Sequence, residues 1–291
     1  MFLLFHACGW AAVIGGATDP TLSMAKNHPQ ALVRHVIQKE LTDTYGTRPP
    51  LRYRLRKVTD HTDTTKEIVE SKDGGVACLV ATGGRPLTTE AQQRERFRLQ
   101  YLRTHPALQE HRRVREQADS ERVKRVIRAL PDAFRYTFSG VEPTPNGPAI
   151  RLTFVPNPGY RPSAYETRAL RGMRGEIWVD QHQQRMVRFE AHQFEDVDFG
   201  WGVLGIMDKG GGMLIEQAEV APPVWALTHL HLVLAGRALL VKPLHYDVEE
   251  TAMDFQRVAN NLPYQQAIDL LLEDNCGMGT ALAQAKTRDH Q

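Results

Sequence analysis

Two histidines two residues apart come nearest to a chemical site by residue type and spacing. His229 and His231 lie in the strand-like run VWALTHLHLVL, so both side chains point to one side of a strand, as metal ligation requires. No cysteine or carboxylate stands beside them at ligand spacing, which favours two histidines on the partly exposed side of a strand. We therefore predict no metal and no cofactor, and a metal-dependent enzyme that uses this pair stays an alternative.

The stretch before these histidines contains an acidic group and a glycine motif. Glu195, Asp196 and Asp198 could supply half of a calcium site, although an acidic strand end at a turn is the commoner explanation. The segment GWGVLG, residues 200–205, matches the dinucleotide pattern G-x-G-x-x-G, which needs a strand before it and a helix after it. Apolar residues alternate straight through the motif and three glycines follow at 210–212, so we predict a strand here and no nucleotide site. No G-x-S-x-G or H-E-x-x-H pattern occurs, and the sequence identifies no reaction.

A cluster of basic residues extends over residues 94–128, with eleven arginines and lysines against five acidic residues. Its side chains, with Arg112, Arg113 and Arg115 as candidates, could dock on anionic headgroups or on another envelope component, which includes a peripheral membrane contact. The simpler interpretation is a solvated helical face with charge pairs between neighbouring turns, such as Arg112 with Glu116. The whole chain carries a net charge of only +2, so we expect no nucleic-acid partner.

The two ends of the sequence bear on its compartment. Residues 2–14 form an apolar run followed by small residues, so we predict a signal peptide over residues 1–17, and the run is too short to span a bilayer. We therefore expect a periplasmic or secreted protein. Two cysteines follow the leader, Cys78 and Cys276; their pairing stays open, and two separate thiols are the favoured outcome. The polar end, residues 273–291, is predicted to be disordered.

The periodicity of apolar residues predicts an α+β fold that is mainly β. Residues 27–42 carry apolar side chains at helical spacing, with Asn27 as the expected N-cap. Alternating strands begin with LRYRLRK and turn at Asp73-Gly74-Gly75. Residues 88–130 predict two charged helices separated at Pro106, the first starting with a capping box of Thr89 and Gln92. Further strands joined by short turns favour an antiparallel sheet, and PYQQAIDLLLED predicts a final helix.

Several segments together resemble an uncharacterised family of secreted bacterial proteins: LRYRLRK, TKEIVESKDGGVACLVA, RALPDAF, EPTPNGPAIRLTFVPNP, MRGEIWVD, FEDVDFGWGVLGIMDKGG and EQAEV. More remotely, the strand order and the IWVD hairpin resemble the periplasmic lipoprotein-carrier and outer-membrane lipoprotein-sorting family. This resemblance implies a strongly curved antiparallel sheet, a half-open barrel, covered by helices over an apolar cavity. It also implies a single carrier-like domain over residues 18–272, in which residues 88–130 are a charged helical insertion.

The leading hypothesis is an exported, non-enzymatic protein that binds a lipid, a lipidated protein or another apolar ligand in the hollow of the sheet. The aromatic residues of the strands are the candidates for lining it: Trp178, Phe189, Phe199, Trp201 and Trp225. The alternative is an envelope scaffold or assembly protein that docks through its basic helices. The sequence indicates neither the ligand nor the oligomeric state.

Overall fold

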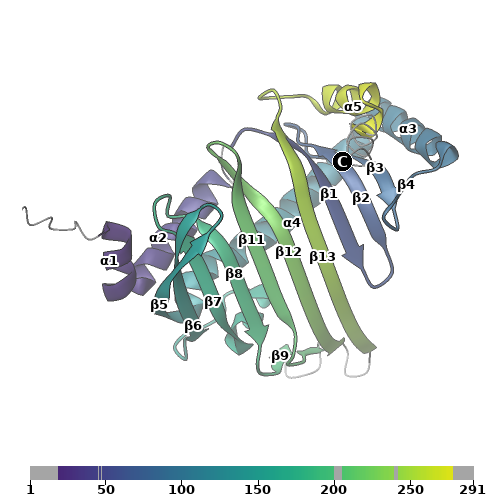
Figure 1. Cartoon of the computed structure of the whole chain (residues 1–291). Helices are drawn as coiled ribbons and strands as arrows, with labels where there is room; N and C mark the ends of the chain where they lie inside the picture. Colours follow the sequence, from purple (N-terminus) through teal and green to yellow (C-terminus); the bar gives the residue numbers. More distant parts are fainter. Residues whose placement is uncertain (1–18, 45, 47, 200–204, 239–241, 278–291) are drawn as a thin grey trace, which may run out of the picture.

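The computed structural model describes residues 19–277 except 45, 47, 200–204 and 239–241. It is an α+β fold built on one thirteen-stranded sheet in which every paired strand is antiparallel to its neighbour (Figure 1). The strand order is β4-β3-β2-β1-β13-β12-β11-β8-β7-β6-β5, and β10 pairs with β12 and with β9. None of the helices in the described part of the chain has both the length and the apolar character needed to cross a membrane.

The elements have the following bounds. The strands are β1 Leu51–Thr59, β2 Asp63–Val69, β3 Val76–Thr82, β4 Arg85–Pro86, β5 Phe134–Thr144, β6 Gly147–Pro156, β7 Met173–Asp180, β8 Met186–Gln193, β9 Val197–Phe199, β10 Gly205–Met207, β11 Gly212–Ala221, β12 Val224–Ala238 and β13 Lys242–Arg257. The α-helices are α1 Pro20–Asn27, α2 Pro29–Asp43, α3 Thr89–Thr104, α4 Pro106–Ala133 and α5 Tyr264–Glu273, and two 3₁₀ helices are η1 Tyr165–Gly172 and η2 Asn275–Gly277.

The charged stretch 88–130 forms α3 and most of α4, and it connects the two edges of the sheet. Strands β1 to β4 reach one edge, and the chain then resumes at β5 on the opposite edge. Helix α4 has 28 residues and at 1.5 Å per residue is about 42 Å long, which is most of the width of about 48 Å that ten strand spacings of about 4.8 Å give between β4 and β5. Figure 1 shows α4 passing behind β11, β12 and β13 on this path. The two helices separated at Pro106 are as predicted.

Two hydrophobic cores lie at opposite ends of the sheet. The first packs α1, α2 and the end of α4 on β5 to β8, with Leu32, Leu130 and Phe154 fully or almost fully buried. The second packs α3, α5 and η2 on β2 and β3, around Leu99 and Ile268. The second core lies on the face of the sheet opposite α4, since Cys78 and Glu67 share a face with Arg54 of β1. The central strands lie beneath the middle of α4 and carry a smaller apolar cluster around Leu51 and Ala226.

The sheet is not the predicted half-open barrel. It is open, with β4 and β5 as its two free edges, and it is not strongly curled. The antiparallel order is as predicted. The strong curvature had been predicted only from the family resemblance, and not from the residues themselves. Closure would need the two edges to approach one another, whereas here each end of the sheet packs its own set of helices.

Three local predictions need correction. Asn27 ends α1 instead of capping a helix, and Asp19 caps α1 by accepting hydrogen bonds from the N–H groups of Thr21 and Leu22. The cap of α3 is Thr88, one residue before the predicted position. The residues on either side of the glycine motif form two separate strands, β9 and β10, which pair with one another in antiparallel fashion. Residues 200–204 of the motif are outside the described part of the chain.

The expectation of two separate thiols is also wrong, because Cys78 and Cys276 form a disulfide. Cys78 lies on β3 and Cys276 follows α5, and the two are separated by 198 positions in the sequence. Helix α5 packs on β2 and β3 and carries the end of the described chain to β3. Such a long-range contact has no local sequence signal.

Candidate ligand-binding hollow

A hollow of about 650 Å³ lies between the central strands and the middle of α4. Its floor is made by β1, β12 and β13, and its sides by the segment before β1 and by the β2–β3 turn. Ser120 reaches it from α4. The helix therefore crosses over the hollow, the first core lies on the same face of the sheet, and the second core lies on the opposite face.

The floor of the hollow is largely apolar. Strand β1 alternates, and its Leu51, Tyr53 and Leu55 face the hollow while its arginines face the other side of the sheet. The neighbouring strand β13 contributes Ala252 and Phe255, and the Phe255 ring stacks on Tyr53 with centroids 5.3 Å apart. Burial raises the pKa of the Tyr53 hydroxyl well above its usual range, so this residue is uncharged at neutral pH.

Two ion pairs lie at the rim of the hollow, which Lys72 also lines. Arg48 donates two hydrogen bonds to the carboxylate of Glu70, at 2.5 and 2.8 Å, and the same carboxylate accepts the N–H of Leu51 at 2.9 Å. On the far side Lys57 binds Glu250 at 2.7 Å. Burial opposes the charge of Lys57, but the bond to Glu250 outweighs burial and raises the lysine pKa. An apolar ligand would therefore meet compensated charges at the rim.

Helix α4 is fixed at both ends of the hollow. Near its start, the Gln109 amide donates to the carbonyl of Asp73, and the Glu116 carboxylate accepts the N–H of Gly75. Gly74 has a φ of +96°, which favours glycine, so the predicted turn is present and α4 packs on it. Toward its end, Leu130 lies in the first core. The middle of the helix is held over the sheet without filling the space beneath it.

A row of half-buried apolar side chains continues from the hollow along the central strands. Leu230 pairs with Glu250, which lines the hollow, so the two share a face of the sheet. Leu232 and Leu234 follow on β12, and Ile215 and Met213 lie beside them on β11. All five have intermediate exposure, although they face the helix-covered side. Ile215 packs against the first core, and the leucines of β12 leave half-exposed apolar surface beyond it.

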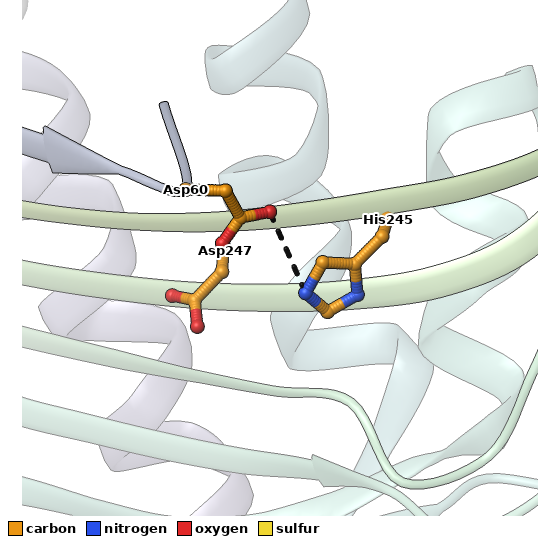
Figure 2. Close-up of side chains that lie close together, drawn as sticks. All are labelled: Asp60, His245 and Asp247. Atoms are coloured by element: carbon orange, nitrogen blue, oxygen red, sulfur yellow. Dashed lines mark ion pairs between the residues drawn. The ribbon is translucent and has the colours of Figure 1, made fainter. Parts of the chain in front are cut away.

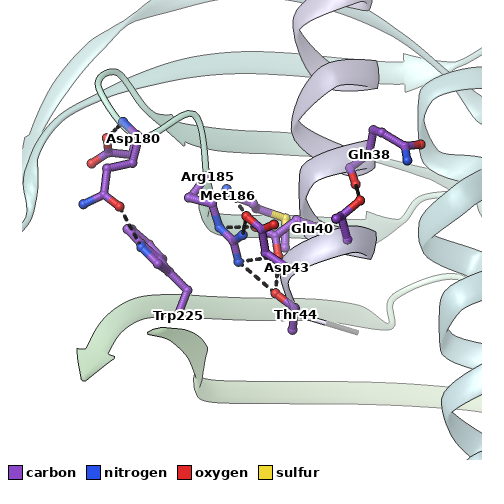
Figure 3. A network of polar contacts seen from close by, with 10 residues as sticks. Gln38, Glu40, Asp43, Thr44, Asp180, Arg185, Met186 and Trp225 are labelled. Atoms are coloured by element: carbon purple, nitrogen blue, oxygen red, sulfur yellow. Dashed lines mark hydrogen bonds and ion pairs between the residues drawn. The ribbon is translucent and has the colours of Figure 1, made fainter. Parts of the chain in front are cut away.

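A second hollow of about 350 Å³ adjoins the first, and Arg48 lines both. It is lined by the ring of Trp225 and by Arg185, whose guanidinium lies 5.7 Å from that ring. Arg185 is almost fully buried and binds Asp43 at 2.8 Å and both carboxylate oxygens of Glu40 at 3.2 Å (Figure 3). Burial raises the pKa of Glu40, although Arg185 acts in the opposite direction. This network fixes the end of α2 to the start of β8.

The structure distributes the five predicted aromatic residues over different places. Phe189 lies in the first core, stacked on Phe154, and Trp178 points to the opposite face, where its indole N–H donates to Glu142 at 2.8 Å. Trp225 lines the second hollow and donates to Gln183. Phe199 belongs to β9 and Trp201 lies outside the described residues. The larger hollow is lined instead by Tyr53 and Phe255.

The three candidate docking arginines differ in their surroundings. Arg112 donates to the carbonyl of Gly75, and burial lowers its pKa. Arg113 binds Glu110 two-fold at 2.6 and 2.7 Å, whereas Arg115 is exposed. Other basic residues of the cluster also pair one turn away, as in Arg98–Glu95 and Arg122–Asp119. These pairs lower the net charge that the helices present to solvent.

The histidines and carboxylates considered as metal ligands are paired with other groups. His229 lies between Glu216 and Glu249, at 3.4 and 3.3 Å, and His231 lies 3.2 Å from Asp247. Asp196 accepts the N–H of Lys209. Glu195, Asp196 and Asp198 line a polar hollow together with Arg168 and Arg171. A calcium site needs mainly acidic surroundings, and the two arginines make these surroundings partly basic.

The class of protein is thus an α+β fold with a large open antiparallel sheet, an overlying crossing helix and a hollow between them. Two solved structures resemble it remotely: a domain assigned to outer membrane lipoprotein sorting from Vibrio parahaemolyticus, and a DUF1329 family protein from Desulfovibrio piger. The first has a TM-score of 0.32 and 7% identity, and the match covers 78% of this chain and 92% of that one. The second has a TM-score of 0.28 and 9% identity, covering 84% and 95%. No family profile and no curated protein match the sequence.

Sequence reasoning missed the residues that line the larger hollow. The alternation of LRYRLRK predicted which side chains of β1 face the interior. It did not predict that β1 lies next to β13, because strand pairing across some 200 residues leaves no local signal. Ser120 was indistinguishable from any polar residue of a charged helix. The sequence offered one signal. Leu230, Leu232 and Leu234 give this strand more apolar side chains than a strand with one face in water requires.

Proposed function

We propose that this is an exported, non-enzymatic protein that binds a lipid, a lipidated protein or a similar apolar ligand between the central strands and α4. The observation that carries the proposal is the 650 Å³ hollow with an apolar floor beneath a helix fixed at both ends. The half-buried leucines of β12 extend the apolar surface beyond it. A ligand lying along this row would cover side chains that neither core shields from water.

The binding energy would come mainly from burial. Each buried methylene contributes about 0.8 kcal/mol, so a chain of a dozen carbons gains about 10 kcal/mol before the cost of immobilising it. The paired charges at the rim add little net attraction, which favours selection by length and shape over selection by headgroup.

Export is supported by the disulfide between Cys78 and Cys276, since such bonds persist mainly in oxidising compartments. The predicted leader, residues 1–17, lies outside the described part of the chain. From the disulfide and the predicted leader together, we propose that residues 18–272 form a single domain located in the periplasm or outside the cell.

Filling the hollow tests the proposal. Ser120→Trp places a large ring over the floor, whereas Ala118→Trp puts the same ring on an exposed position of the same helix. We expect Ser120→Trp to weaken binding of a fluorescent sixteen-carbon fatty acid by about tenfold or more, and Ala118→Trp to leave it unchanged.

Native mass spectrometry of the wild-type protein after mild purification provides the second measurement, with co-purified lipid as the expected result. The proposal fails if the wild-type protein neither retains lipid nor binds the fluorescent fatty acid. It also fails if both tryptophan variants bind like wild type while their circular dichroism spectra match that of the wild-type protein.

A further inference from the structure

Three side chains gather on the face of the sheet opposite the hollow (Figure 2). Asp60 lies in the β1–β2 turn, and His245 and Asp247 lie on β13. One ligand atom from each, a carboxylate oxygen or an imidazole nitrogen, lies within 4.8 Å of the other two. His245 and Asp247 alternate along β13 with Val248 and Glu250, so they point away from the hollow and form a site separate from it.

Arginine or lysine neutralises some of the neighbouring carboxylates on the same strands. Further along β1, Arg56 binds Asp63 at 3.0 Å and Lys57 binds Glu250 at 2.7 Å, so permanent cations neutralise those carboxylates. At the end of β1 the carboxylates pair with histidines instead. Among the described residues, Asp60 forms an ion pair only with His245, at 3.7 Å, and Asp247 only with His231, at 3.2 Å.

Neither of these partners is a guanidinium or an ammonium group. The two carboxylates of Asp60 and Asp247 therefore stand close together without a permanent positive charge between them. A divalent cation bound by both would remove their repulsion, and the nitrogen of His245 would complete three protein ligands.

The positions of the ligands are well fixed. Strand β13 is paired on both sides, to β1 and to β12. The turn that carries Asp60 is held by Thr59 and Thr62, whose N–H, carbonyl and hydroxyl groups bond one another at 2.7 to 3.0 Å. Ligands on such rigid elements lose little conformational entropy on binding.

We propose that Asp60, His245 and Asp247 bind a divalent transition metal ion of the zinc class. One imidazole and two carboxylates suit zinc, whose tetrahedral ligand atoms lie about 3.4 Å apart, so the side chains need to move together by about 1 Å. His231, hydrogen-bonded to Asp247, acts as a positioning residue for that carboxylate. Bound metal would join the β1–β2 turn to β13. This site differs from the His229–His231 pair considered from the sequence.

Titration of zinc into metal-stripped protein without a polyhistidine tag, followed by isothermal calorimetry at pH 7.5, tests the proposal. We expect one saturable site, about 10–100-fold weaker in His245→Ala and in Asp247→Asn. His229→Ala is the matched control, because His229 also lies between two carboxylates on this face but is outside the group. It is expected to bind zinc like wild type.

Thermal unfolding gives an independent measurement, because a ligand that binds only the folded state raises the midpoint of unfolding. Zinc should raise the midpoint of wild type and of His229→Ala, and should leave that of His245→Ala unchanged. Wild type without saturable binding below about 100 µM zinc, a level at which a three-ligand site is occupied, would overturn the proposal. So would His245→Ala binding as tightly as wild type, or His229→Ala losing as much affinity as His245→Ala.

Discussion

Individual charged residues in this protein are stabilised by very different surroundings. Glu95 of α3 is mostly buried, and burial alone would raise the pKa of its carboxyl group. Hydrogen bonds from Arg98 and from the N–H of Leu79 on β3 outweigh burial and lower that pKa. Glu110 on α4 also has a lowered pKa from an arginine one turn away, yet it is exposed and touches no other element. Of these two carboxylates, only Glu95 connects its helix to the sheet.

The pH dependence of stability should reflect this difference. A carboxyl whose pKa is lower in the folded state than its ordinary value of 4.5 stabilises the fold above pH 4.5, and this stabilisation is lost as the pH falls through the lowered value. We expect Glu95→Gln to lower the free energy of unfolding by about 1–2 kcal/mol at pH 7, with a smaller difference from wild type below pH 4.5. Urea unfolding at several pH values measures it. Glu110→Gln should have no measurable effect, and equal losses in both variants would contradict the assignment.

At the scale of elements, the sequence predicted local structure well and contacts between elements poorly. The strands of β1 to β3, the break at Pro106 and the final helix followed from periodicity and turn residues. Helix α1 was missed, although Asp19-Pro20 is a typical N-cap followed by proline at the first helical position, because the stretch was attributed to the region after a leader. Which helix packs on which strand depends on long-range contacts, and Arg185 meeting Glu40 is one of them.

The attachment of α2 to β8 gives a prediction about that contact. Arg185→Met leaves Glu40 buried without its cation, and we expect a loss of about 3–5 kcal/mol in the free energy of unfolding. Arg34→Met is the control on the same helix, since the Arg34–Asp132 pair is more than half exposed on both sides and should matter by less than about 1 kcal/mol. Chemical denaturation measures both. A small effect of Arg185→Met would mean that Glu40 takes up a proton or that water reaches it.

The whole molecule follows from one topological step, in which the chain leaves one edge of the sheet at β4 and restarts at the other edge at β5. The long α4 that makes this step binds the β2–β3 turn near its start and packs in the first core at its end, and the hollow lies beneath its middle. Neither the hollow nor the histidine-rich face opposite it could be predicted, because each combines strands far apart in the sequence. The Cys78–Cys276 disulfide belongs to the second core alone.

Loss of that disulfide should therefore weaken one end of the molecule selectively. In Cys276→Ser, we expect the free energy of unfolding of the second core to fall by about 2–4 kcal/mol, because α5 and η2 are no longer joined to β3. Hydrogen exchange followed by mass spectrometry should show faster exchange in α5 and β3 and unchanged exchange in α2 and β7, which belong to the first core. Cys78→Ser should give the same pattern, since it removes the same bond. Equal acceleration in α2 would show that the two cores unfold as one cooperative unit, and α4 would then transmit stability across the hollow instead of merely spanning it.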